Sequence, residues 1–210
     1  MSAHTTTVGC HHGKSASLGK PSRTGEHVLE GSHHCNPISS RPLSFPWTTD
    51  FVKRTCTITG ATIDAAMDVL LTSASVACNA AGGTHHAFSN RGEGFCIYND
   101  MAVAIRLALY RGWITQAIVV DLDVHQGNGT AEIFHQDPAV YTLSVHGDSN
   151  YPWKTRFAGD ADYALPDSCS QQLFLDTVRL SLRQVVERRD LNQPTLVVYQ
   201  AGVDPLQSDR

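Results

Sequence analysis

The stretch from Ile118 to Thr130, which reads IVVDLDVHQGNGT, constrains the fold more than any other part of the chain. It begins with an apolar, β-branched run and ends in a glycine-rich turn, which is the pattern of a buried strand in a parallel sheet. In open α/β sheets, ligands bind beyond the carboxyl ends of the strands. Asp121, Asp123 and His125 lie at that end and alternate, so they share one face. Two carboxylates and an imidazole there suit a divalent cation such as zinc. The alternative is a solvated loop whose acids cap the next helix.

A second motif favours the metal-site interpretation. Residues 81–87 read AGGTHHA, so the adjacent His85 and His86 follow a Gly-Gly pair at which the backbone can turn tightly. A lone histidine is more often a packed core residue than a catalyst. A pair of histidines that precedes an acidic strand end instead indicates proton-transfer chemistry.

Composition bounds the class of protein. The chain has 210 residues, enough for one domain core, and its 41% hydrophobic and 17% charged residues predict a globular fold. The formal net charge of −4 gives no basis for direct, charge-driven binding of nucleic acid. No apolar run is long enough to span a bilayer, so we expect no membrane partner. Six cysteines without regular spacing predict reduced thiols rather than a disulfide framework.

The remaining pattern predicts alternating strands and helices. Helices are expected over residues 58–71, from a cap at Asn99 or Asp100 to Arg111, and over 173–186. A short helix capped by Thr49 or Asp50 is expected to run to Arg54, and a helical turn is expected at 131–135. Strands are expected at residues 118–120, 140–144 and 195–199, with a short buried segment at 75–80. This order predicts an α/β fold with a doubly wound or similarly layered sheet.

Residues 1–40 differ from the rest of the chain. They are rich in Ser, Thr, Gly and His, and acids are absent before Glu26. Low hydrophobicity without a period predicts a disordered tail, and an organellar transit segment is the alternative interpretation of this acid-poor, Ser-rich start. The domain itself is therefore expected to occupy residues 41–210.

Four segments together resemble a known family. GGTHHAFSNRGEGFCIYND, VVDLDVHQGNGTAEIF, YTLSVHG and YQAGVDPLQSD are similar to the zinc-dependent histone deacetylases and their bacterial acetylpolyamine and acetoin-utilisation relatives. The similarity runs from about Phe45 to Arg210 and is greatest to the branch of class IV and bacterial deacetylases. It implies a single arginase-like domain around a mostly parallel sheet, and zinc-dependent removal of acetyl groups from acetyl-lysine in histones or other proteins, or from acetylpolyamines. It also implies a nuclear or cytoplasmic enzyme, with an organelle as the alternative suggested by the amino-terminal segment. An arginase-like di-metal enzyme fits less well, because the chain has a single DLDVH set.

The resemblance assigns roles by matching motif. It makes Asp123, His125 and Asp209 the zinc ligands. His86 resembles the general base and His85 its partner in proton transfer. Asp121 would hold His85, and Asn128, where many relatives have Asp, would hold His86.

The remaining roles concern substrate and a second ion. Gly94 and Phe95 would line the acetyl-lysine channel. Tyr151 lies on an aromatic loop that either walls this channel or packs as an ordinary surface loop. A structural K⁺ is a further expectation, held by oxygens near Asp121, Asp123, His125 and Ser144.

One expected element is not found in the sequence. The family uses a tyrosine after a glycine run, beyond the third ligand, to stabilise the oxyanion, and the chain ends at Arg210 before such a segment. Loss of one oxyanion donor commonly costs about a hundred- to thousandfold in rate. The alternative function is therefore a catalytically impaired, truncated deacetylase that acts only by binding partners, or has no function. The strand at 195–199 is then expected at an exposed sheet edge.

Overall fold

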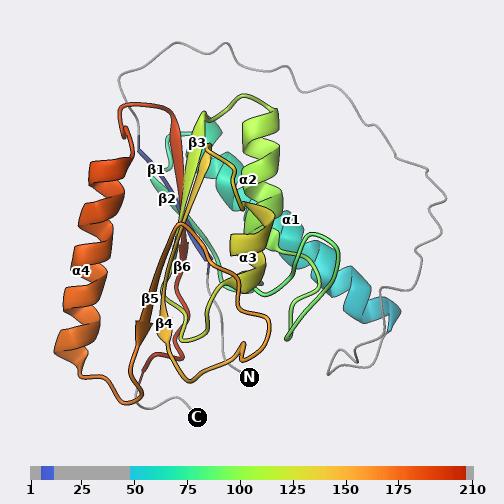
Figure 1. Ribbon diagram of the computed structural model, residues 1–210. Helices are drawn as coiled ribbons and strands as arrows, with labels where there is room; N and C mark the ends of the chain where they lie inside the picture. The colour runs from blue at the N-terminus through green and yellow to red at the C-terminus, as the bar shows by residue number, and fades with distance from the viewer. Residues whose placement is uncertain (1–5, 12–47, 207–210) are drawn as a thin grey trace, which may run out of the picture.

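The computed structural model describes residues 6–11 and 48–206, in which six strands form one twisted sheet (Figure 1). The strand order is β2-β1-β6-β3-β4-β5. β3 runs parallel to β6 and β4, and β4 runs parallel to β5, whereas β1 is antiparallel to both of its neighbours. The strands are β1 (Thr6–His11), β2 (Val76–Asn79), β3 (Gln116–Asp121), β4 (Val140–Gly147), β5 (Ala161–Leu165) and β6 (Thr195–Gln200).

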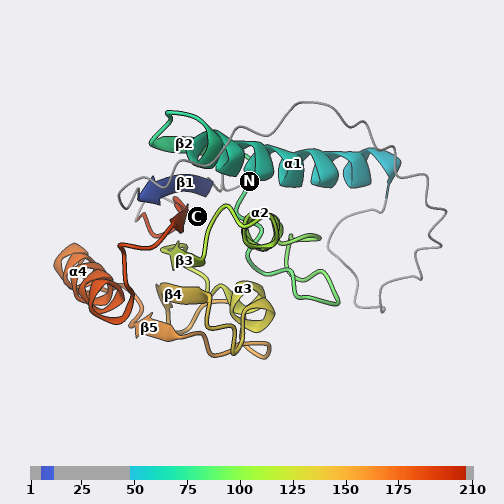
Figure 2. The same cartoon turned by 90° about the horizontal axis from the view of Figure 1, so that it is seen from above.

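Helices cover the two faces of the sheet unequally (Figure 2). Three helices lie on one face and a single long helix lies on the other, which confirms the predicted α/β class. On the first face lie α1 (Thr49–Leu71), α2 (Asp100–Tyr110) and α3 (Asn128–Ile133), and on the second lies α4 (Gln171–Arg188). None of the helices in the described part of the chain is long and apolar enough to cross a bilayer.

Two apolar clusters fill the spaces between the layers. In the first, α1 and α2 pack Val69, Met101 and Ile105 against Val119 and Val198 of the sheet, and all five are almost completely buried. In the second, Val185 of α4 packs over the other face, against a group that includes Ile118, Leu143 and Leu165. β3 is buried along its whole length, because its alternate residues supply both clusters.

The elements nearest the site are those that the sequence predicted best. α2 begins after Asn99, whose side chain accepts a hydrogen bond from the amide of Ala102, and ends at Tyr110, shortly before Gly112, which has a φ of +67°. The central strand at 118–120 and the strands at 140–144 and 195–199 are found as β3, β4 and β6. The helix expected at 173–186 is found as α4.

Other elements differ from the predictions. The two helices expected before Leu71 are one helix, α1, which is capped by Thr48 rather than by Thr49 or Asp50. β2 lies at the sheet edge and leaves Val76 63% exposed, so the segment at 75–80 is only partly buried. The disorder expected for residues 1–40 is wrong for residues 6–11, which form β1 between β2 and β6. The other residues of 1–40 lie outside the described part.

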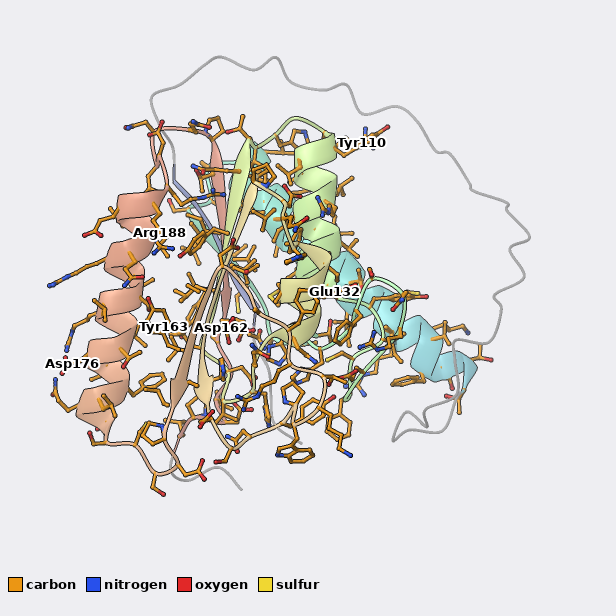
Figure 3. All side chains as sticks on the ribbon, in the orientation of Figure 1. Tyr110, Glu132, Asp162, Tyr163, Asp176 and Arg188 are labelled. Atoms are coloured by element: carbon orange, nitrogen blue, oxygen red, sulfur yellow. The ribbon has the colours of Figure 1, made fainter. Side chains whose placement is uncertain are left out.

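β5 was not predicted, because its five residues, ADYAL, have neither a sustained apolar run nor a regular alternation. Tyr163 and Asp162, both labelled in Figure 3, point to opposite faces, as successive strand residues do. The Tyr163 hydroxyl donates to Gln184 of α4 at 2.6 Å. The Asp162 carboxylate accepts from the Gln126 side chain at 2.9 Å, near the start of α3. β5 therefore connects the two helical layers.

Candidate metal centre and proton-transfer site

The predicted site residues gather at one edge of the sheet, where the parallel strands end. Asp121 at the end of β3 pairs with Gln200 of β6 and with Ser144 of β4, so the three strands end close to one another. The loop that carries His85 and His86 reaches the same edge, because the Gln200 side chain donates to the carbonyl of Gly83 at 3.1 Å.

Three side chains at this edge form a potential metal-binding cluster. Asp123, His125 and Asp204 each offer a ligand atom, and these atoms lie within 4.8 Å of one another. Nδ1 of His125 is 2.8 Å from Oδ1 of Asp123 and 3.2 Å from Oδ2 of Asp204. The amide of Val124 donates to Oδ1 of Asp204 at 3.0 Å, which fixes that carboxylate beside the β3 end. Of the alternating residues Asp121, Asp123 and His125, the last two belong to the cluster, whereas Asp121 contacts His85 and Asp204 takes the third place.

The electrostatics of the cluster favour a cation. Burial lowers the pKa of His125, but the hydrogen bonds that it donates to the Asp123 and Asp204 carboxylates outweigh burial and raise the pKa to about 10. Asp123 is fully buried, and two buried carboxylates placed together require positive charge. A divalent cation with oxygen and nitrogen preference fits this donor set.

Asp204 belongs to this cluster, although the sequence did not single it out as a ligand. Asp204 and Asp209 both follow β6 in the segment AGVDPLQSD, and the family resemblance implied that Asp209 is the third zinc ligand. Asp209 lies outside the described residues, so its role stays a prediction. Asp204 can reach Asp123 because Gly202 has no side chain: a Cβ there would lie 2.6 Å from Oδ2 of Asp123.

His85 and His86 lie side by side behind the cluster, with ring centroids 4.1 Å apart. His85 Nδ1 is 2.6 Å from Oδ2 of Asp121, as predicted. Burial lowers the pKa of His85, but the Asp121 and Asp123 carboxylates more than offset this and raise it to about 9. His85 is therefore the protonated member of the pair at neutral pH.

His86 has the opposite electrostatic environment. Its Nδ1 is 2.8 Å from Oδ1 of Asn128, as predicted, and both side chains are buried. Burial and the positive charge on His85 hold the pKa of His86 well below its usual range, and the hydrogen bond to Oδ1 of Asn128 does not offset them. His86 is thus neutral at neutral pH, which a general base requires.

Asp100 holds the histidine loop in place, although the sequence analysis considered it only as a helix cap. Its fully buried carboxylate accepts from the amides of Gly83 and Thr84, at 3.1 and 2.8 Å, and from the Thr62 hydroxyl at 2.6 Å. α2 therefore carries the loop anchor in its first turn. An acid in the first turn of a helix would have suggested only a favourable interaction with the helix dipole.

The residues predicted to contact substrate surround His86. Gly94 has a φ of +59°, and a Cβ there would lie 3.1 Å from Cδ2 of His86. Tyr151 places its ring edge-on to that of His86, with centroids 4.8 Å apart. The Phe95 side chain is 67% exposed, and its role in lining a substrate channel stays a prediction. Glu93, which the sequence analysis did not single out, accepts a hydrogen bond from the Tyr151 hydroxyl at 3.0 Å.

Ser144, expected near a structural K⁺, is buried beside the end of β3. Its hydroxyl is 2.9 Å from Nδ1 of His146, also on β4. The K⁺ site stays a prediction.

Comparison with known proteins agrees with this geometry. The histone deacetylase domain model matches residues 18–210. An uncharacterised protein of Picosynechococcus sp. is 42% identical over 174 residues, which are 83% of this chain and 56% of that protein. Histone deacetylase 2 of Arabidopsis thaliana is 35% identical over 151 residues, which are 71% of this chain and 38% of that protein. The crystal structure of acetylpolyamine aminohydrolase from Burkholderia pseudomallei superposes with a TM-score of 0.59 at 26% identity, covering 74% of this chain and 46% of that one.

The chain thus spans between about a third and just over half of the length of these relatives. Within that span, the family match includes the acidic strand end, the paired histidines and the segment after β6. The match covers most of the chain, and the superposition on the solved relative covers 74% of it. The chain belongs to the histone deacetylase domain family, with its arginase-like α/β fold.

Proposed function

We propose that this chain forms the metal-binding and proton-transfer part of a zinc-dependent amide hydrolase that removes acetyl groups from acetyl-lysine, in histones or other proteins, or from acetylpolyamines. The observation that carries the proposal is the convergence of Asp123, His125 and Asp204 beside two buried histidines of different protonation. Family membership and the acetylpolyamine aminohydrolase likeness support the choice of substrate class.

Asp123, His125 and Asp204 would hold the zinc ion. Three protein ligands are the number that catalytic zinc sites use, and the oxygen and nitrogen donors are suitable. We infer that Asp204, rather than Asp209, is the third ligand, because its carboxylate already faces Nδ1 of His125. When bound, zinc supplies Lewis-acid polarisation of the acetyl carbonyl and lowers the pKa of the attacking water.

The two histidines divide the proton transfers between them. His86 takes the proton of the attacking water at Nε2, because its Nδ1 is engaged by Asn128. The C–O bond forms as this proton passes to His86, and the C–N bond breaks as the amine nitrogen receives a proton from His85, which releases acetic acid and the free amine. His85, protonated and held by Asp121, stabilises negative charge near the acetyl oxygen. Gly94, Phe95 and Tyr151 would guide the alkyl chain of the substrate toward these groups.

An acetate-release assay tests the proposal. The zinc-loaded chain is incubated with an acetyl-lysine peptide and with an N-acetylated diamine. We expect hydrolysis of at least one substrate and a loss of about 10²- to 10⁴-fold in His86→Ala, the usual contribution of a general base. His135→Ala, which changes an exposed histidine outside the site, should retain the rate. Equal rates in the two variants, or no hydrolysis of either substrate, would contradict the proposal.

A further inference from the structure

The carboxylate of Glu93 lies one hydrogen bond beyond the pair formed by His86 and Asn128. Oε1 of Glu93 accepts from Nδ2 of Asn128 at 3.0 Å and from the Tyr151 hydroxyl at 3.0 Å, and it also accepts from the Thr155 hydroxyl. The Glu93 side chain is 15% exposed and Asn128 is fully buried. Three donors on one largely buried oxygen indicate that this part of the site is arranged around the carboxylate.

The contacts of Asn128 determine which way its side-chain amide points. Nδ2 donates to Oε1 of Glu93 and to the carbonyl of Thr155, at 3.0 and 2.9 Å, and both of these oxygens can only accept. The amide oxygen must therefore face Nδ1 of His86. An acceptor at this position requires the proton of the neutral imidazole to be on Nδ1, which leaves Nε2 as the basic nitrogen.

Glu93 supplies one of the two oxygens that accept from the Asn128 amide and holds the residue that supplies the other. It accepts from Asn128 directly, and it binds the hydroxyl of Thr155, whose carbonyl is the second acceptor. The same oxygen holds Tyr151, whose ring lies against that of His86. Removing the carboxylate thus frees Asn128 to rotate, and a rotated amide would present its NH₂ group to His86.

We propose that Glu93 is a positioning residue that acts through Asn128 to hold His86 in the Nδ1–H tautomer, with Nε2 unprotonated for catalysis. This inference rests on the proposed function, in which Nε2 of His86 is the base. Glu93, which lies between Gly92 and Gly94, would thus take over part of the role of a carboxylate hydrogen-bonded directly to His86.

Glu132 provides a matched control. It is a second acid that fastens a neighbouring loop, because its carboxylate accepts from the amide and the hydroxyl of Ser89 at 3.1 and 2.9 Å. It projects from α3 (Figure 3), and Asn128 has no hydrogen bond to it among the described contacts. Glu132→Ala therefore removes a loop contact of the same kind without removing the Asn128 acceptor.

The tautomer can be measured directly by ¹⁵N NMR of the full chain labelled at histidine, with His86→Gln to assign the signals. In the parent chain and in Glu132→Ala, we expect His86 to carry its proton on Nδ1. In Glu93→Ala, we expect a shift toward the Nε2–H form. Retention of the Nδ1–H form in a folded Glu93→Ala variant would overturn the inference.

Kinetics provide the second readout. In Glu93→Ala, kcat should fall about 10- to 100-fold, less than removal of the general base itself, while KM stays within about twofold and zinc content is unchanged. Glu132→Ala should retain kcat. A parent chain that hydrolyses nothing would refute the proposed function, whereas the NMR result would still decide the role of Glu93.

A pair of variants keeps the inference testable if Glu93→Ala does not fold. Asn128→Asp places a carboxylate directly against Glu93, so we expect a lower melting temperature and lower kcat. Adding Glu93→Gln should restore at least part of both losses, because the new amide can donate to the new carboxylate. Losses that are simply additive in the double variant would show that the two positions are not coupled and would overturn the inference.

Discussion

Burial makes each charged side chain of the site depend on its neighbours. Asp123 is fully buried, and the Asp204 carboxylate lies close to the same imidazole nitrogen. Although burial lowers the pKa of His125, hydrogen bonds to these carboxylates raise it to about 10. A proton on His125 and a divalent cation therefore compete for the same negative charge, and metal binding should release a proton.

His146 gives a prediction for stability that is separate from metal binding. It is 3% exposed, and burial lowers its pKa from the usual 6.5, with Asp162 opposing and Arg156 reinforcing the shift. The unfolded chain therefore binds a proton more readily than the folded chain as the pH falls below about 6.5. We expect the contribution of His146 to the free energy of unfolding to decrease over this range, by at most about 1.4 kcal/mol for each pH unit.

Urea unfolding at about pH 7.5 and about pH 5.5, in the presence of a chelator, measures this effect. His146→Gln keeps a polar side chain but cannot titrate, so its stability should decrease less than that of the parent chain. An equal decrease in both proteins would show that His146 does not contribute.

The sequence correctly predicted several pairs of side chains that lie together in the site. The alternation of side chains predicted that Asp123 and His125 lie together, and they do, although both lie in the bend after β3, where the amide and the ring of His125 face Oδ1 of Asp123. The pairs of His85 with Asp121 and His86 with Asn128 were also correct. Asp204 could not be distinguished from Asp209 by spacing, because both acids follow the strand in an irregular segment. Glu93 could not be recognised because its partners are 35, 58 and 62 residues away.

At the scale of elements, the ends of β3 and β6 must come unusually close for the cluster to form. Gly202 permits this approach: a Cβ there would lie 2.6 Å from Oδ2 and 2.9 Å from Cα of Asp123. These neighbours include a buried backbone atom that cannot easily move. We expect Gly202→Ala to lower the free energy of unfolding by about 1–3 kcal/mol and to weaken zinc binding at least tenfold.

Gly60→Ala is the control for this prediction. Gly60 lies within α1, and a Cβ there would have no atom within 4 Å. That variant should raise the free energy of unfolding by about 0.5–1 kcal/mol, because alanine favours the helix. Thermal and denaturant unfolding of both variants check the opposite signs, and a neutral or stabilising Gly202→Ala would disprove the close-approach argument.

Helices and strands could be predicted where the signal for them lies within their own sequence. Asn99 and Gly112 mark the two ends of α2, and the apolar runs of β3 and β6 identify buried strands. β1 and β5 had no comparable signal, because pairing with neighbouring strands rather than sequence pattern stabilises them. The strand found as β6 was expected at an exposed sheet edge. This expectation is wrong, because β6 lies between β1 and β3.

At the scale of the whole molecule, the site is assembled from segments that are distant in sequence. The histidine loop follows β2, the paired acids follow β3, and Asp204 follows β6, at the far end of the described chain. A largely parallel sheet brings these ends together, and helices on both faces supply the buried clusters that hold the strands (Figure 2). Metal binding is therefore a test of whether this fold assembles as a unit.

The zinc content of the purified chain tests this account most directly, with Asp123→Ala, Asp204→Ala and Asp209→Ala measured in parallel. We expect about one zinc ion per chain in the parent protein, as for a single three-ligand site, and the same in Asp209→Ala. Asp123→Ala and Asp204→Ala should lose nearly all of it while remaining folded. A parent chain that is folded and binds no zinc would contradict the account, as would an Asp204→Ala variant that keeps its zinc while Asp209→Ala loses it.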